Sequence, residues 1–85
     1  MKNLTNKQVA ERFAKLYNDG KSGTMFIELG VVYSYGYHFP IAKRISNTEV
    51  EFTTDGYSVT TAKHKSLVLK ALKENDWIIT YKSFK

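Results

Sequence analysis

The feature that most restricts the fold of this chain is its lack of cysteine at a length of only 85 residues. A chain this short buries about 60% of the surface that its unfolded form exposes. No disulfide or cysteine-bound metal can add stability, so packing in a single core has to supply it. Six tyrosines, five phenylalanines and one tryptophan give that core a large apolar area. The sequence therefore predicts one globular domain over residues 1–85.

An amphipathic helix is predicted to begin after Thr5. Thr5 and Gln8 have the spacing of a capping box, in which each side chain bonds the backbone N–H of the other residue. Apolar residues then recur at helical spacing as far as Tyr17. The following Asn18-Asp19-Gly20 contains residues suited to the left-handed conformation that commonly ends a helix. The apolar face of this helix is expected to consist of Val9, Phe13, Leu16 and Tyr17.

The middle of the chain has the alternation and turn signals of antiparallel strands. Strands are expected at residues 24–29, 31–37, 41–45 and 48–54, with a short strand at 57–59 and a closing strand at 77–82. A second helix is expected from about Ala62 to Glu74, capped by Thr60 or Thr61. These elements predict an α+β fold, in which an antiparallel sheet of four to five strands packs against two helices in the order α-β-β-β-β-α-β.

Both helices and the sheet are expected to share one core, and His64 is expected to lie in it. The predicted core residues are Val9, Phe13, Leu16, Phe26, Phe52, Leu67, Val68, Ala71 and Leu72. Helical spacing places His64 on the apolar face of the second helix. We expect its imidazole to be buried and hydrogen-bonded to a hydroxyl or backbone carbonyl of the sheet near Tyr35 to His38. A ligand-binding role for His64 is the alternative.

The residues that commonly carry catalysis do not form a recognisable pattern in this sequence. There is no nucleophile elbow, P-loop or dinucleotide fingerprint, and Glu49 and Glu51 are best interpreted as surface residues of a strand. A metal site that used His38 and His64 would need a third ligand to which the sequence does not point. We therefore expect no catalytic residue, metal or cofactor, and a hydrolase or metal enzyme that uses either histidine is the remaining alternative.

The charge distribution suggests where an anionic partner would bind. The net charge is +5, and residues 61–85 contain six lysines but only Glu74 and Asp76 as acidic residues. A basic row on the second helix is predicted to consist of Lys63, Lys65, Ser66, Lys70 and Lys73. An anion site at the helix start is predicted to use Ser58, Thr60 and Thr61, through hydroxyls and free backbone N–H groups. A solvated helix face without a binding role is the alternative interpretation of the lysines.

A further surface is predicted at Tyr35, Tyr37 and His38, where the strand pattern fails before Pro40. Two strings of residues lie here and at the second helix. The first is Tyr33-Ser34-Tyr35-Gly36-Tyr37-His38-Phe39-Pro40, and the second is Tyr57-Ser58-Val59-Thr60-Thr61-Ala62-Lys63-His64. Together with their flanking residues, roughly 24–72, they resemble a small domain found in phages and other mobile genetic elements, a family without an assigned activity.

The resemblance implies a context for the protein. It implies a phage or plasmid accessory protein that acts in the cytoplasm of a bacterial host, and the lack of a catalytic pattern leads us to expect a protein without enzymatic activity. Small proteins in that setting often block a host nucleoprotein or nuclease complex, so we expect an inhibitor of a host nucleic-acid-handling defence protein, of the anti-CRISPR type. Direct binding of RNA or DNA by the second helix and the C-terminal lysines is the alternative function.

The expected location and oligomeric state follow from the distribution of apolar residues. No uninterrupted apolar run is longer than three residues, and the N-terminus has no apolar signal-peptide core, so we expect neither membrane insertion nor secretion. A homodimer is expected if the Trp77 to Tyr81 strand lies exposed at a sheet edge, because unpaired strand edges favour pairing. Otherwise, a monomer is expected.

Overall fold

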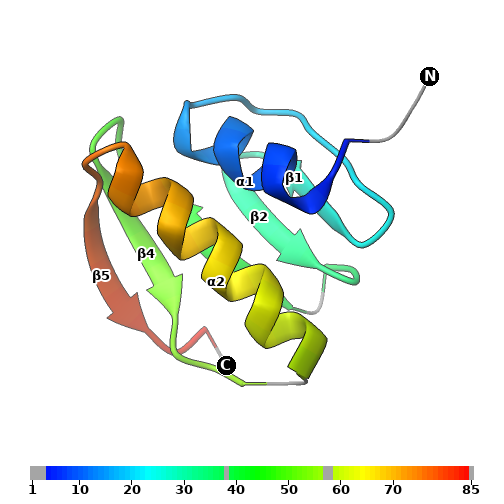
Figure 1. The fold of residues 1–85 in the computed structure, drawn as a ribbon. Coiled ribbons are helices and arrows are strands. Elements are labelled where there is room, and N and C mark those ends of the chain that lie inside the picture. Colours follow the sequence, from blue (N-terminus) through cyan, green and yellow to red (C-terminus); the bar gives the residue numbers. More distant parts are fainter. Residues whose placement is uncertain (1–3, 38, 57–58, 85) are drawn as a thin grey trace.

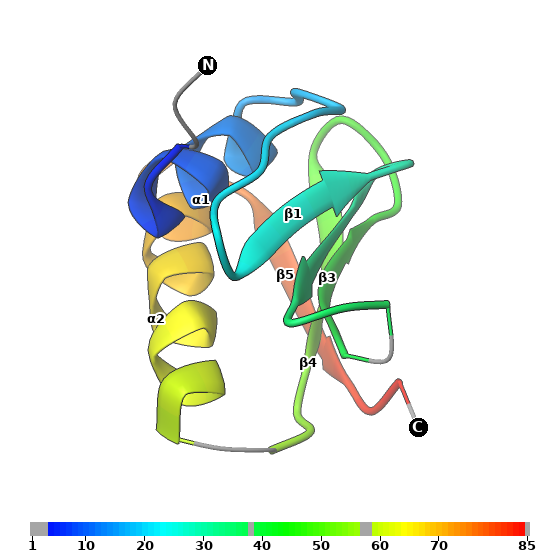
Figure 2. The same ribbon diagram turned by 90° about the vertical axis from the view of Figure 1, so that its right-hand side faces the viewer.

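A computed structural model of the chain describes residues 4–37, 39–56 and 59–84, and it confirms an α+β fold in the order α-β-β-β-β-α-β. The elements are α1 (Asn6–Ala14), β1 (Met25–Glu28), β2 (Val31–Ser34), β3 (Pro40–Arg44), β4 (Glu49–Thr53), α2 (Val59–Glu74) and β5 (Ile78–Lys82). The strands form one sheet in the order β1-β2-β3-β4-β5, and both helices lie against the same face of it (Figure 1, Figure 2). Within the described ranges, neither helix has the length and apolar character needed to cross a membrane.

The direction of the last strand differs from the prediction. Strands β1 to β4 pair antiparallel, but β5 pairs parallel to β4, with Ile78 opposite Glu49 and Lys82 opposite Thr53. The cause is the connection, because α2 carries the chain back along the sheet before β5 begins. The sheet is therefore mixed, and the predicted all-antiparallel arrangement is wrong for this one strand.

Helix α1 begins as predicted but ends one turn early. The Thr5 hydroxyl accepts from the Gln8 N–H (3.1 Å), and the Gln8 side chain accepts from the Thr5 N–H (2.9 Å), which completes the capping box. At the other end Leu16 is left-handed (φ 69°), and the Tyr17 N–H donates to the Arg12 carbonyl at 2.9 Å. This is a Schellman ending, and it turns the Leu16 side chain outward, where it is 45% exposed. The prediction of Leu16 as a core residue is wrong.

Helix α2 begins earlier than predicted and ends in the same manner as α1. Its first residue is Val59, so the predicted short strand at 57–59 is wrong at Val59, while Tyr57 and Ser58 lie outside the described residues. At its end Asp76 is left-handed (φ 60°), and the Trp77 N–H donates to the Leu72 carbonyl at 3.1 Å. This turn directs the chain into β5.

The core lies between the helices and the sheet. The structure confirms burial of Val9, Phe13, Phe52, Val68, Ala71 and Leu72. Leu67 is only half-buried against the core. Phe26 is also half-buried, because its neighbours in β1, Met25 and Ile27, take the inward positions and alternation leaves Phe26 on the opposite face.

The packing of Phe13 gives a test of the core. Its ring is fully buried under the Arg44 guanidinium, whose carbon lies 4.9 Å from the ring centre. Replacing Phe13 with Ala should lower the free energy of unfolding by about 3–5 kcal/mol, because it removes apolar contacts and leaves a cavity. Leu16→Ala, at an exposed position just after the same helix, should cost less than about 1 kcal/mol. Urea unfolding of both variants checks this, and equal losses would contradict the assignment of the buried face.

Candidate functional site

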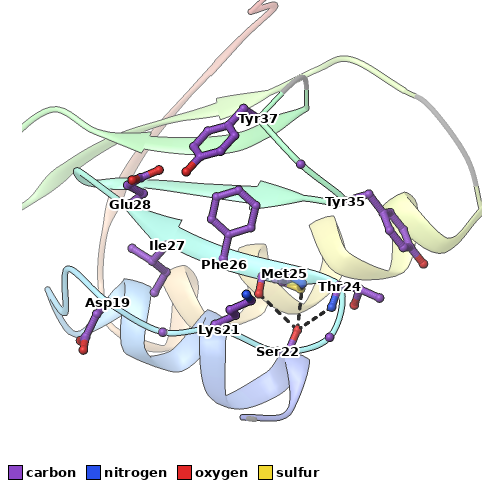
Figure 3. A pocket seen from close by; sticks show the side chains of 13 residues that line it. Asp19, Lys21, Ser22, Thr24, Met25, Phe26, Ile27, Glu28, Tyr35 and Tyr37 are labelled. Atoms are coloured by element: carbon purple, nitrogen blue, oxygen red, sulfur yellow. Dashed lines mark hydrogen bonds between the residues drawn. The ribbon is translucent and has the colours of Figure 1, made fainter.

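A groove of about 620 Å³ lies along β1, at one edge of the sheet. One wall is the segment 19–24, and the other is formed by β1 and the turn at 35–37 (Figure 3). The Ser22 hydroxyl shapes the wall, since it accepts from the Met25 N–H (2.8 Å) and the Thr24 N–H (3.2 Å). The groove is lined by charges of both signs, from Asp19, Lys21 and Glu28. It is therefore suited to a polar partner of mixed charge.

Three aromatic rings lie together on the sheet face that the helices leave open. Phe26 of β1 stacks on Tyr33 of β2 at 4.9 Å between ring centres, and Tyr37 meets both rings edge-on at 5.0 and 5.2 Å. We call Phe26, Tyr33 and Tyr37 the aromatic cluster. Tyr37 is 65% exposed and hydrogen-bonds Glu28, which raises the pKa of its phenol because the bond favours the protonated form. Figure 3 shows the Tyr37 ring beside Phe26, with its hydroxyl pointing toward the Glu28 carboxylate.

The two predicted surface tyrosines face different parts of the molecule. The predicted strand 31–37 ends at Ser34, because Tyr35 is left-handed (φ 61°) and Gly36 follows with φ 133°. The turn leaves Tyr37 in the aromatic cluster but places the Tyr35 ring 5.3 Å from the His64 ring. Both tyrosines are exposed and line the groove, as a binding surface requires. The third residue of this prediction, His38, lies outside the described residues.

His64 is the centre of a polar network inside the core. It is 2% exposed, and its Nδ1 lies 2.7 Å from the Ser34 hydroxyl of β2. Its Nε2 lies 3.2 Å from the Asn6 side-chain nitrogen and 3.3 Å from the Thr24 hydroxyl. The Asn6 side-chain oxygen accepts from the hydroxyls of Ser22 and Thr24. The predicted burial of His64 and its bond to a hydroxyl of the sheet are confirmed.

The partners of His64 define its protonation. The Asn6 oxygen is occupied by two hydroxyl donors, so its NH₂ group faces Nε2 and donates to it. Nε2 is therefore the acceptor, and the proton on Nδ1 donates to Ser34. Burial lowers the pKa of His64, because the charged form loses hydration. The ring is neutral and enclosed, and such a group serves structure better than proton transfer to a substrate.

The basic row on α2 is largely exposed. Lys63, Ser66, Lys70 and Lys73 are exposed along the helix, and the Ser66 hydroxyl donates to the Ala62 carbonyl. Lys65 differs from the others, because it is half-buried and its amine donates to the Asp55 carbonyl at 2.8 Å. The structure therefore leaves Lys63, Lys70 and Lys73 as the available cations of the predicted row.

The predicted anion site at the start of α2 is not supported at Thr61. This residue is 1% exposed, so its hydroxyl faces the interior and is inaccessible to an anion in solvent. Ser58 lies outside the described residues, as does the side chain of Thr60. The prediction is thus wrong for Thr61. The physical reason is that the helix begins at Val59, which rotates Thr61 onto the inner face beside His64.

The sequence analysis did not identify the partners of His64 or the aromatic cluster. Asn6, Ser22 and Thr24 are polar residues of a helix start and a loop, and such residues are common at solvent-exposed positions. Only the antiparallel register, which sets Phe26 opposite Tyr33, brings the rings together. Pairing the two predicted strands in antiparallel register would have placed Phe26 opposite Tyr33, and this was the signal that could have indicated the cluster.

Among the residues that the structure describes, no three His, Cys, Asp or Glu side chains lie close enough to hold a metal ion. Comparison of the chain with protein-family models, with curated proteins and with solved structures found no match in any of the three. The surface chemistry of the chain itself is therefore the observation from which its function has to be argued.

The network around His64 predicts acid sensitivity. Because the folded-state pKa is depressed, the stabilisation is complete above the unfolded pKa of about 6.5 and is lost as the pH falls through that value toward the folded pKa. His64→Ala should lower the free energy of unfolding by about 1–3 kcal/mol at pH 7, because it leaves Ser34 and Asn6 without their partner.

Denaturant unfolding at pH 7.5 and pH 5 tests both statements. Wild type should lose more stability between these values than His64→Ala, which has no imidazole to protonate. If the variant keeps full stability, or if both proteins lose the same amount on acidification, the structural role assigned to His64 is wrong.

Proposed function

We propose that this chain is a non-enzymatic accessory protein of a phage or other mobile element, which binds and inhibits a host nucleic-acid-handling defence protein in the manner of anti-CRISPR proteins. The observation that carries the proposal is the aromatic cluster on the open sheet face, next to the groove along β1. The host nucleoprotein or nuclease complex is the partner, and the bacterial cytoplasm is the place of action.

The composition of this surface favours a protein partner. Exposed tyrosines supply a large contact area with few rotatable bonds, and aromatic residues are enriched in the centres of protein interfaces. Around the cluster, Lys21 is accompanied by Asp19 and Glu28, so the local charge is mixed rather than basic. A polyanion would be repelled by the carboxylates, whereas a protein surface can offer complementary groups to both signs.

The two strings that resemble a mobile-element domain combine structural and surface residues. Ser34 and His64 are buried and bonded to one another, so they support the scaffold. Tyr35 and Tyr37, both from the first string, are exposed and line the groove. A resemblance that included only core residues would imply the fold alone. The inclusion of exposed tyrosines supports a shared binding surface as well.

Binding to purified defence effectors tests the proposal. The protein should co-elute with its target on size exclusion and inhibit the nuclease activity of that target. Tyr37→Ala should weaken binding by roughly 10- to 100-fold, as loss of a central aromatic contact does, with little change in melting temperature. Tyr17→Ala is the matched control, because Tyr17 is an exposed tyrosine outside the groove and the cluster. If no effector is retained or inhibited, this function is excluded.

Direct binding of nucleic acid is the second candidate, and the exposure of Lys63, Lys70 and Lys73 along α2 favours it. A row of this kind can follow a phosphate backbone without reading its sequence. Affinity that depends on such contacts falls with salt, because each neutralised phosphate releases a counterion.

A gel-shift series with RNA and DNA at low and moderate salt tests this candidate. Lys70→Ala combined with Lys73→Ala should leave the free energy of unfolding within about 0.5 kcal/mol of wild type. The same variant should weaken binding and reduce the salt slope by about 2. The control replaces Lys7 of α1 and Lys15, which caps the end of α1, with Ala. This change removes the same charge from another exposed surface. No shift at low salt would contradict this candidate.

A further inference from the structure

One edge strand of the sheet, β1, is covered by another segment of the chain, whereas the other edge strand, β5, is open. The β1 edge is covered, since the Ile27 N–H donates to the Gly20 carbonyl (2.9 Å) and the Ser22 N–H donates to the Met25 carbonyl (2.8 Å). Strand β5 forms the opposite edge of the sheet, and no described segment pairs with its outer side (Figure 1). Monomeric proteins usually protect such an edge with charge, proline or a bulge.

The backbone of β5 has hydrogen-bonding groups that point away from the sheet. The Ile78 N–H donates to the Thr48 carbonyl (2.9 Å), and the Thr54 N–H donates to the Lys82 carbonyl (3.0 Å). In a parallel pair the residues that bond to the neighbour alternate along the strand, so Ile78, Thr80 and Lys82 face β4. The N–H and C=O groups of Ile79 and Tyr81 consequently point outward.

We propose that β5 pairs antiparallel with β5 of a second copy of this chain, about a two-fold axis through Thr80. This axis sets Ile79 opposite Tyr81 of the second copy, and each such pair exchanges both N–H···O bonds. Thr80 meets its own counterpart as the intervening non-hydrogen-bonded pair. The register satisfies every outward-pointing backbone group between Ile78 and Lys82, and it joins the two sheets into one.

The side chains of β5 suit this register. Ile78 is 59% exposed and Tyr81 is 54% exposed, a large apolar surface for a five-residue strand. Tyr81 already packs edge-on against Phe52 at 5.9 Å between ring centres. Pairing sets Ile79 beside this ring in the second copy, and aromatic and β-branched residues are a favourable cross-strand pair. A second copy of this chain is therefore the partner that complements both the free backbone groups and the exposed side chains of β5.

The charged side chains on the open face of the sheet are also consistent with a two-fold axis through Thr80. Lys82 pairs with Glu51 at 3.7 Å within one copy, whereas the exposed Glu49 carboxylate forms no ion pair with the described residues. Glu49 lies opposite Ile78 in the parallel register, and the axis puts Lys82 of the second copy on the far side of Ile78. A lysine side chain is long enough to reach the carboxylate across one strand.

The lysines of α2 predict how salt affects this association. Lys70 and Lys73 line a shallow hollow with Leu69 on the outer flank of α2, and Leu69 also borders the hollow that contains Tyr81. Pairing through β5 brings the two flanks toward each other. Salt screens both the repulsion between these lysines and the attraction of Lys82 for Glu49 of the other copy. The dimer should therefore depend on salt far less than binding to nucleic acid does.

Sedimentation equilibrium tests the dimer. Wild type should dimerise at micromolar to millimolar concentration, while Thr80→Lys and Thr80→Glu should each be monomeric, because like charges then face each other across the axis. An equimolar mixture of these two variants should recover the dimer. Leu29→Lys, at the exposed turn between β1 and β2 on the opposite side of the sheet from β5, adds the same charge and should leave the dimer intact. Thermal melts of each variant confirm that it is folded.

A crosslink tests the register, since the chain has no cysteine of its own. Two copies of Thr80→Cys would have Cα atoms about 4.5 Å apart, within the reach of a disulfide. Two copies of Ile78→Cys would be separated by roughly 13 Å and should remain reduced. Mild oxidation should therefore crosslink the first variant and not the second.

Two sets of results would overturn the proposal. One is a wild type that stays monomeric at about 1 mM, where even weak pairing would be detected. The other is a dimer that survives in Thr80→Lys, or that crosslinks through Ile78→Cys in preference to Thr80→Cys, because either result assigns the association to another surface or register.

Discussion

The hydrogen-bond network of His64 connects four separate parts of the chain. The imidazole belongs to α2, and its partners come from the first turn of α1, the loop before β1 and the end of β2. An enclosed polar group is costly unless its partners are all in place, so this network requires the four segments to meet in one arrangement. The position of β1, and with it the groove, depends on that arrangement.

The other end of the helical layer is held by side chains that satisfy helix carbonyls. The Trp77 indole donates to the Ala14 carbonyl at 2.7 Å, and the Arg44 guanidinium donates to the Phe13 carbonyl at 2.8 Å. The last carbonyls of a helix lack their usual partner within it. The Trp77 bond satisfies the carbonyl of Ala14, and Arg44 adds a second bond to the carbonyl of Phe13, which also accepts from the Leu16 N–H at 3.3 Å. Arg44 of β3 and Trp77, which directly precedes β5, thereby fix the end of α1 against the sheet.

This arrangement separates structural residues from those available for binding. Both helices cover one face of the sheet, so buried groups such as Ser34 and His64 are directed inward (Figure 2). The opposite face carries the aromatic cluster, and the outer surface of α2 carries the lysines. A partner protein, an anionic partner and a second copy would each use a different region, which allows their effects to be measured separately by substitution.

Local interactions explain what the sequence alone determined about this protein. The capping box at Thr5, the order of helices and strands and the burial of His64 follow from contacts within a few residues or from the period of one helix. The direction of β5, the outward turn of Leu16 and the opposite sides taken by Tyr35 and Tyr37 were decided only in the tertiary structure. Leu16 and Tyr35 adopt left-handed backbone angles, which cost free energy locally and persist because contacts with distant residues offset that cost. The direction of β5 depends on the path of the preceding helix. The aromatic cluster and the partners of His64 likewise form only when residues far apart in the chain come into register.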